Sequence, residues 1–249
     1  MVAGAAYRAH GLSVSGAIAA WVVGAVTFAV GGWGAALVLF AFFVPSSILS
    51  RVGRARKRGL VDIGKHGARD AWQVLANGGV AALCMLLSLH YGALALAAFA
   101  GAFAAASADT WGTEIGTLAR GLPRSLLTLR SIPTGLSGGV SWQGTIAECA
   151  GAACVALVAQ ATAVAPFVPV AIAGIAGATI DSLLGASAQA LRFCPACERA
   201  CETNPHACGT ATTLRRGFAW LENDAVNLAA TASGALIAAC AVGFLGRLE

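Results

Sequence analysis

Long apolar runs constrain this chain more than any other feature. Stretches of Ala, Gly, Val and Leu recur along its 249 residues, and several are long enough to cross a hydrocarbon core about 30 Å thick. Only 11% of the residues are charged and 58% are hydrophobic, whereas soluble domains carry about 25% charged residues. A bilayer core offers no water to backbone polar groups, so such runs must form helices. The sequence therefore predicts an all-α, polytopic helical membrane bundle that forms one integral membrane domain over residues 1–249.

The apolar runs predict about seven membrane-spanning helices. The first two should form a hairpin hinged at Gly31-Gly32-Trp33-Gly34. With this count, fifteen of the sixteen Lys and Arg residues fall on one side of the membrane, and only Arg247 falls on the other. The positive-inside rule makes the basic side cytoplasmic. We therefore expect a multi-pass cell-membrane protein with a retained N-terminus, and with that N-terminus and the long loops in the cytoplasm. The predicted spans lie near residues 12–31, 33–50, 77–90, 92–108, 138–160, 165–190 and 225–245.

Carboxylates occur where the predicted spans reach the basic side. Asp109 and Glu114 follow an uncharged apolar run, Asp181 lies near the end of the sixth span, and Asp224 starts the last span. Acids at a membrane edge are costly to bury, so they usually face a wet cavity or a cation. For an isolated acid, a solvated helix cap is the alternative. Clustered hard oxygen ligands suit Mg²⁺. We therefore predict that these four acids form one catalytic magnesium site, while the place of Glu148, two turns into the fifth span, stays open.

Polar side chains and glycines near these acids suit a phosphate. Arg69, Gln73 and Asn77 recur at i, i+4 and i+8, which predicts a polar stripe on a helix entering the membrane, although hydrogen bonding between helices is an alternative. The segment 137–141 is rich in glycine and hydroxyls, and such a helix start presents N–H groups and a positive dipole end to an anion. The basic cluster 51–58 either sets topology and attracts anionic lipid or gathers a polyphosphate. The residues expected to bind substrate or nucleotide are Lys65, Arg69, Asp70, Gln73, Asn77, Thr113, Ser137, Gly138, Gly139, Ser141, Ser182, Asn223 and Asn227.

A Cys/His loop, residues 191–222, is inserted between the last two spans. Cys194-Pro-Ala-Cys197 is followed by His206-Ala-Cys208, which has the ligand types and tight spacing of a structural zinc site. Cys201 is left over. A cytoplasmic loop argues against disulfides, and reduced, metal-free cysteines are the alternative. The sequence therefore predicts a zinc knuckle on the cytoplasmic side.

Together these patterns predict a cytoplasm-facing site for phosphate and magnesium. Phosphoryl transfer depends mostly on positioning and charge stabilisation, which these residues could supply. The alternatives are a transporter, because polar stripes on glycine-broken helices also line substrate paths, and a cytidylyltransferase that forms a CDP-lipid.

Five segments resemble one known integral-membrane family, which contains plant phytyl-phosphate kinase and animal transmembrane protein 19. The segments are Asp70-Ala-Trp-Gln-Val-Leu-Ala-Asn-Gly-Gly79, Ala108-Asp-Thr-Trp-Gly-Thr-Glu-Ile-Gly116, Ser137-Gly-Gly-Val-Ser141, Asp181-Ser-Leu-Leu-Gly-Ala186 and Asn223-Asp-Ala-Val-Asn227. The resemblance implies an all-helical multi-pass bundle. It also implies phosphorylation of an isoprenyl monophosphate, of the phytyl or geranylgeranyl type, with a nucleoside triphosphate such as CTP. The expected partners are therefore the bilayer, the nucleotide and the isoprenyl phosphate, with no nucleic acid.

The chain departs from the family pattern at two places. It has Ile132-Pro-Thr-Gly-Leu136 where members often read Val-Pro-Pro-Gly-Thr, which bears on recognition of the donor. Glu148 stands where a small or apolar residue is expected, which bears on the acceptor pocket.

Overall fold

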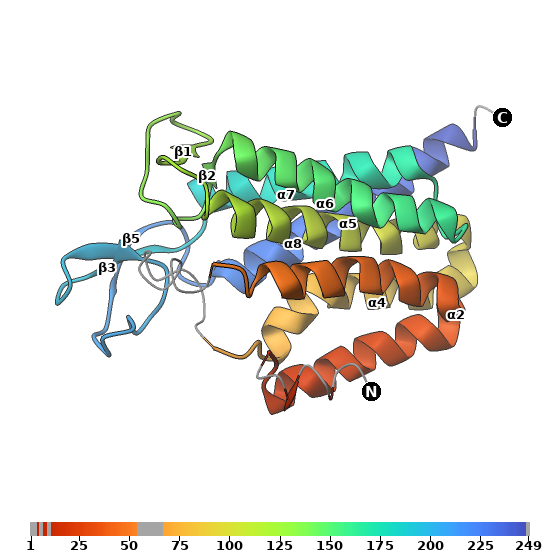
Figure 1. Cartoon of the computed structure of the whole chain (residues 1–249), viewed down its shortest axis with the longest axis horizontal. Coiled ribbons are helices and arrows are strands. Elements are labelled where there is room, and N and C mark those ends of the chain that lie inside the picture. Colours follow the sequence, from red (N-terminus) through yellow and green to blue (C-terminus); the bar gives the residue numbers. More distant parts are fainter. Residues whose placement is uncertain (1–3, 5–6, 9–10, 54–66, 248–249) are drawn as a thin grey trace.

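The computed structural model describes residue 4 and residues 7–8, 11–53 and 67–247. Within these ranges, six helices are long and apolar enough to cross a membrane, and they lie together in one bundle (Figure 1). The prediction of a polytopic helical membrane bundle is confirmed. The helices are α2 (Val14–Leu49), α4 (Ala71–Tyr91), α5 (Ala93–Gly116), α6 (Trp142–Ala161), α7 (Phe167–Ser187) and α8 (Asn223–Leu245).

Helix α2 is the predicted hairpin. A straight helix of its 36 residues would be about 54 Å long. Instead, residues at both of its ends contact Arg69: the Ser13 N–H donates to the Arg69 carbonyl at 3.0 Å, and Arg69 Nη2 donates to Ser50 Oγ at 3.0 Å. The reversal occurs at Gly32, whose φ of 61° and ψ of −154° are accessible essentially only to glycine. Six helices therefore provide seven apolar segments between the two ends of the bundle (Figure 1).

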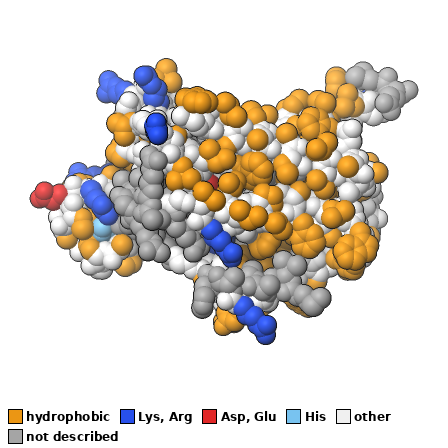
Figure 2. All heavy atoms as spheres, viewed as in Figure 1, with side chains coloured by type: hydrophobic (Ala, Val, Ile, Leu, Met, Phe, Trp, Pro, Cys, Tyr) orange, Lys and Arg blue, Asp and Glu red, His pale blue; other side chains and the backbone are white. Residues whose placement is uncertain are grey.

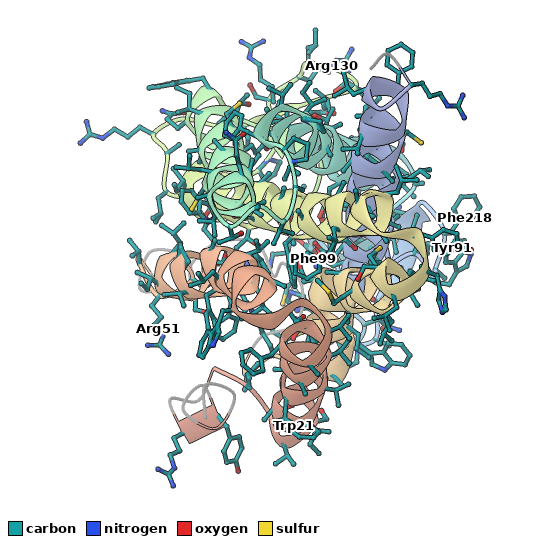
Figure 3. The ribbon with its side chains drawn as sticks, turned by 90° about the vertical axis from the view of Figure 1, so that its right-hand side faces the viewer. Trp21, Arg51, Tyr91, Phe99, Arg130 and Phe218 are labelled. Atoms are coloured by element: carbon teal, nitrogen blue, oxygen red, sulfur yellow. The ribbon has the colours of Figure 1, made fainter. Side chains whose placement is uncertain are left out.

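Helix α5 is the centre of the bundle. It packs against each of the other five helices, and Phe99, which is fully buried, lies in the middle of the end-on view, whereas Trp21 and Tyr91 lie at the periphery (Figure 3). Small residues allow this close packing. A Cβ on Gly101 would lie 2.5 Å from the Gly234 carbonyl oxygen of α8. In a bilayer, contacts of this kind hold helices together, because lipid tails are as apolar as the side chains.

The outer surface fits a membrane environment. On the face seen in Figure 2, hydrophobic side chains are spread over the helices, and the visible Lys and Arg side chains lie mostly toward the end that carries the strands. Trp72, Trp142 and Trp220 are 72%, 70% and 73% exposed, and each lies where a helix starts at that end or just before it. Trp33 and Tyr91 are exposed at the opposite end. Aromatic residues favour the two membrane–water interfaces, so these positions mark the edges of the membrane-spanning region.

Two small antiparallel sheets extend the bundle at one end (Figure 1). Strands β1 (Arg124–Ser125) and β2 (Gly139–Val140) pair between α5 and α6. The Cys/His loop contains a three-stranded sheet in the order β4-β3-β5, formed by β3 (Leu191–Cys194), β4 (Arg199–Cys201) and β5 (Thr213–Arg216). The membrane domain itself is all helical, as predicted.

Candidate active site

A cavity of about 270 Å³ lies at the end of the bundle that carries the strands. Its walls come from the ends of five helices, α4 to α8, and from the segment 134–141. Most residues predicted for the site line this one cavity, so the tertiary fold brings together residues that are far apart in the sequence. They are Arg69, Gln73, Asn77, Asp109, Thr113, Glu114, Ser137, Gly138, Gly139, Ser141, Asp181, Ser182, Asn223, Asp224 and Asn227.

Two acids meet inside the cavity. The side chains of Asp109 on α5 and Asp181 on α7 lie within hydrogen-bonding reach of each other. Two carboxylates this close either share a proton, so that only one is ionised, or hold a cation between them. The pair therefore suits a cation with hard oxygen ligands.

Glu148 is a third acid of the same cavity. It projects from α6 and lies close enough for its charge to act on both Asp109 and Asp181. Gly112 of α5 makes room for it, because a Cβ at that position would lie 2.5 Å from Glu148 Cγ. The place of Glu148, which the sequence left open, is therefore in the wall of the cavity.

Groups that suit an anion line the rest of the cavity. Helices α4, α6 and α8 each present their N-terminal end to it, and helix N-termini carry partial positive charge and free N–H groups. At α6, Ser141 is the N-cap and accepts from the Gly144 N–H at 3.2 Å. Arg69 lies at the start of α4, where its charge acts on Glu114. The cavity thus combines acids that suit a cation with positive groups that suit a phosphate.

The segment 134–141 is fixed against α7 by its backbone. Gly138 has a φ of +78°, and a Cβ there would lie only 2.3 Å from the Ala186 N atom. Behind it, the Glu202 carboxylate accepts from the Ser137 N–H at 2.7 Å and from the Ser137 hydroxyl at 2.8 Å. The sequence reasoning missed Glu202, because no periodicity or motif singles it out within the Cys/His loop.

The predicted zinc ligands form one cluster. One ligand atom from each of Cys194, Cys197, His206 and Cys208 lies within 4.8 Å of all the others. Cys194 Sγ lies 3.6 Å from Cys208 Sγ, and tetrahedral Zn–S bonds of about 2.3 Å place two sulfur atoms about 3.8 Å apart. His206 faces the cluster through Nδ1, 3.1 Å from Cys208 Sγ. The four residues therefore fit a metal ion of the zinc type, and Cys201, buried on β4, lies outside the group.

The pKa values of two thiols in the cluster shift in opposite directions. Hydrogen bonding with Thr210 and His206 lowers the pKa of the Cys208 thiol to about 6. Hydrogen bonding with Cys208, together with smaller effects of burial and of Cys194, raises the pKa of Cys197 to about 11. A thiolate is the form that binds metal, and the lowered pKa of Cys208 favours that form.

Comparison with known proteins also identifies the chain as an integral membrane protein. Residues 1–235 match the family described as "Integral membrane protein DUF92". The chain belongs to this family. The family predicted from the five segments is thereby confirmed. No solved structure gives a significant match.

Relatives of this DUF92 protein occur in plants and cyanobacteria. "Protein PGR" of Arabidopsis thaliana is 30% identical over 224 residues, which cover 78% of this chain and 77% of the relative. "Protein VTE6, chloroplastic" of the same plant is 26% identical over 95% of this chain and 67% of its own length. "Uncharacterized membrane protein sll0875" of Synechocystis is 26% identical over 88% of this chain and 78% of the relative.

One residue predicted to bind substrate does not line the cavity of this DUF92 protein, and another lies outside the described residues. Asp70 is not among the residues that line it. It is the N-cap of α4, where its side chain accepts from the Gln73 N–H at 3.0 Å and the Gln73 side chain accepts from the Asp70 N–H at 3.1 Å. This reciprocal capping box accounts for an acid at this position. Lys65 lies outside the described residues.

Proposed function

We propose that this DUF92 protein is a membrane phosphotransferase that uses a nucleoside triphosphate, with CTP as the donor, to convert an isoprenyl monophosphate into the diphosphate. Family membership supports this reaction, through the resemblance to the family of phytyl-phosphate kinase. The single observation that carries it is the Asp109–Asp181 pair in a cavity to which three helix N-termini point. That arrangement suits a metal-bound polyphosphate better than it suits a neutral solute.

The proposed reaction needs no general base. The phosphate of an isoprenyl monophosphate is largely dianionic near neutral pH, since its second pKa is about 6. One of its oxygens attacks the γ-phosphorus of the donor, and the bond between that phosphorus and the β–γ bridging oxygen breaks, which releases the nucleoside diphosphate. Described residues offer no histidine to the cavity, which fits a reaction whose nucleophile is already ionised.

The side chains of the cavity would then position charge. Asp109 and Asp181, with Glu114 and Asp224 at the same end, would hold Mg²⁺, which neutralises the charge that develops on the phosphate oxygens. Arg69 and the N-termini of α4, α6 and α8 would hold the phosphates in line. Electrostatic positioning of this kind is the main contribution that a protein makes to phosphoryl transfer.

The depth of the cavity suits an acceptor with a lipid tail. The cavity lies at the level of Trp72, Trp142 and Trp220, which mark one membrane interface. The phosphate of an isoprenyl phosphate would sit at that interface while its chain lies among the acyl chains. Toward the middle of the bundle the interior is filled by Phe99, Phe103 and Met85, all of them almost completely buried. A filled interior favours an enzyme over a transporter.

The test is to assay the purified protein in lipid nanodiscs. It would be incubated with Mg²⁺, with CTP or ATP, and with phytyl or geranylgeranyl monophosphate, and both products would be identified by mass spectrometry. CDP and prenyl diphosphate support the proposal. Pyrophosphate and a CDP-lipid would show a cytidylyltransferase instead. Absence of turnover with every pair, together with solute uptake into proteoliposomes, would show a transporter.

A further inference from the structure

We propose that Glu202 is a positioning residue, through which the Cys/His loop sets the shape of the cavity. The carboxylate holds Ser137 at two points, with Oε1 2.7 Å from the Ser137 backbone nitrogen and Oε2 2.8 Å from Ser137 Oγ. Gln189, just beyond the C-cap of α7, donates from Nε2 to Glu202 Oε2 at 3.1 Å and to Ser137 Oγ at 2.9 Å. We call Glu202, Gln189 and Ser137 the clasp. It joins three segments that are distant in the sequence.

The clasp holds the cavity wall from outside the cavity. Ser137 lines the cavity, whereas Glu202 and Gln189 are not among the lining residues. Glu202 is 7% exposed and Gln189 is 2% exposed, so the carboxylate is inaccessible to a ligand. A buried carboxylate is retained at this position only because donors surround it. Its role is therefore to fix Ser137 and not to touch the substrate.

The four ligands of the Cys/His cluster lie on both sides of Glu202 along the chain. Cys194 and Cys197 lie before it on the β3–β4 hairpin, and His206 and Cys208 follow it. Glu202 directly follows Cys201, which pairs in register with Arg192 of β3. A metal bound to the four ligands closes the chain on both sides of Glu202, which removes conformational freedom from the short segment between them.

Movement at Ser137 must reach the cavity. The next two residues, Gly138 and Gly139, line it, and the Gly138 backbone packs on Ala186 so closely that even a Cβ is excluded. Ala186 lies at the end of α7, the helix that carries Asp181. The clasp therefore fixes the anion-binding segment relative to the acid pair, and loss of the metal is expected to loosen that relation.

The structural test is hydrogen exchange of the protein in nanodiscs, and it does not depend on the proposed function. Glu202→Gln keeps the shape of the side chain, but an amide has one acceptor oxygen where the carboxylate uses two to receive three donors. Exchange in the segment 134–141 should rise at least about tenfold, since loss of a hydrogen bond to a charged group weakens protection. The matched control is Glu198→Gln, which changes an exposed acid of the same loop.

Removal of the metal tests whether the Cys/His loop acts on the segment 134–141 through Glu202. Chelation of the wild-type protein should raise exchange in 134–141 to the level of Glu202→Gln and should leave the turn 162–166, at the opposite end, unchanged. Chelation of Glu202→Gln should add nothing there. If chelation leaves the wild-type segment protected, or if the effects of chelation and Glu202→Gln add, the Cys/His loop does not act through Glu202 and the proposal is overturned.

The functional consequence rests on the proposed function and is measured separately. The probe is magnesium tripolyphosphate, and its dissociation constant would be determined by calorimetry. Glu202→Gln should raise that constant at least about tenfold, while Glu198→Gln should not change it. Changed exchange in a protein whose wild type binds no tripolyphosphate would keep the clasp and refute the phosphate site. Normal exchange and normal affinity in Glu202→Gln would refute the clasp and leave the phosphate site intact.

Discussion

The carboxyl groups of Asp109 on α5 and Asp181 on α7 lie within hydrogen-bonding reach of each other across the cavity. Like charges this close repel strongly in a partly buried site. The pair is therefore stable only with a shared proton or with a cation between the two groups. Substitution of either acid therefore tests directly whether the cavity holds a cation.

Replacement of either acid by its amide should strongly reduce turnover and leave the fold intact. Asp109→Asn and Asp181→Asn each remove a ligand charge while keeping the shape of the side chain. If the pair holds Mg²⁺, turnover should fall at least about a hundredfold, the scale seen when one electrostatic catalytic group is lost. The melting temperature without Mg²⁺ should stay the same or rise, because the amide relieves repulsion between two acids. The measurement is the assay of CDP formation together with a thermal unfolding curve.

Glu198→Gln is the matched control for the acid pair, since it removes a carboxylate that is exposed and outside the cavity. It should change neither turnover nor the melting temperature. Near-normal turnover in both cavity variants would show that the acids serve only to hold the helices together.

Gly138→Ala should damage both stability and activity. The Gly138 φ of +78° is unfavourable for alanine, and the added Cβ would overlap the Ala186 backbone, so the segment 134–141 must move. Gly121→Ala provides the control, because Gly121 has a φ of +97° and no atom lies within 4 Å of the place that an added methyl group would take. The control should lose only about 1–2 kcal/mol of conformational energy. Equal activities of the two variants would contradict a tight contact between this segment and α7.

The Cys/His cluster is predicted to bind one zinc ion. Metal analysis of protein purified without chelator should give about one equivalent, which Cys197→Ser should lose because three ligands bind zinc far more weakly than four. Cys201→Ser, outside the four-residue group, should keep the metal. A wild-type protein without zinc would refute this site while leaving the phosphotransferase proposal untouched.

The orientation in the membrane is predicted from the basic residues. Reporters fused after Arg58 (which lies outside the described residues), Gly121 or Glu202 should report the cytoplasm, because the topology predicted from the sequence assigns fifteen of the sixteen Lys and Arg residues to that side. A cysteine placed at Ala163, in the turn at the opposite end, should react with a membrane-impermeant thiol reagent in intact cells. Reaction of the native Cys208 under the same conditions would reverse the orientation.

Much of the architecture follows from the sequence alone. Apolar runs fix the positions of the helices, because transfer of a segment into lipid depends on its local composition. The Gly31–Gly34 hinge also follows from local sequence, since only glycine tolerates the backbone angles found at Gly32. Acids and amides at the helix ends indicated a polar site, because such groups are costly in lipid wherever the helices pack.

Only the tertiary structure decided how these groups meet. Contact between Asp109 and Asp181 depends on the rotation of α5 and α7 about their axes, and the insertion of Glu148 into the cavity wall depends on the absence of a side chain at Gly112. Asp70, which the sequence predicted to bind substrate, is the N-cap of α4, because that helix starts at Ala71. Glu202 contacts Ser137 because the small sheet, in which Cys201 pairs with Arg192, places it there. Composition fixes which segments enter the membrane, whereas side-chain contacts depend on backbone angles and packing that no single segment contains.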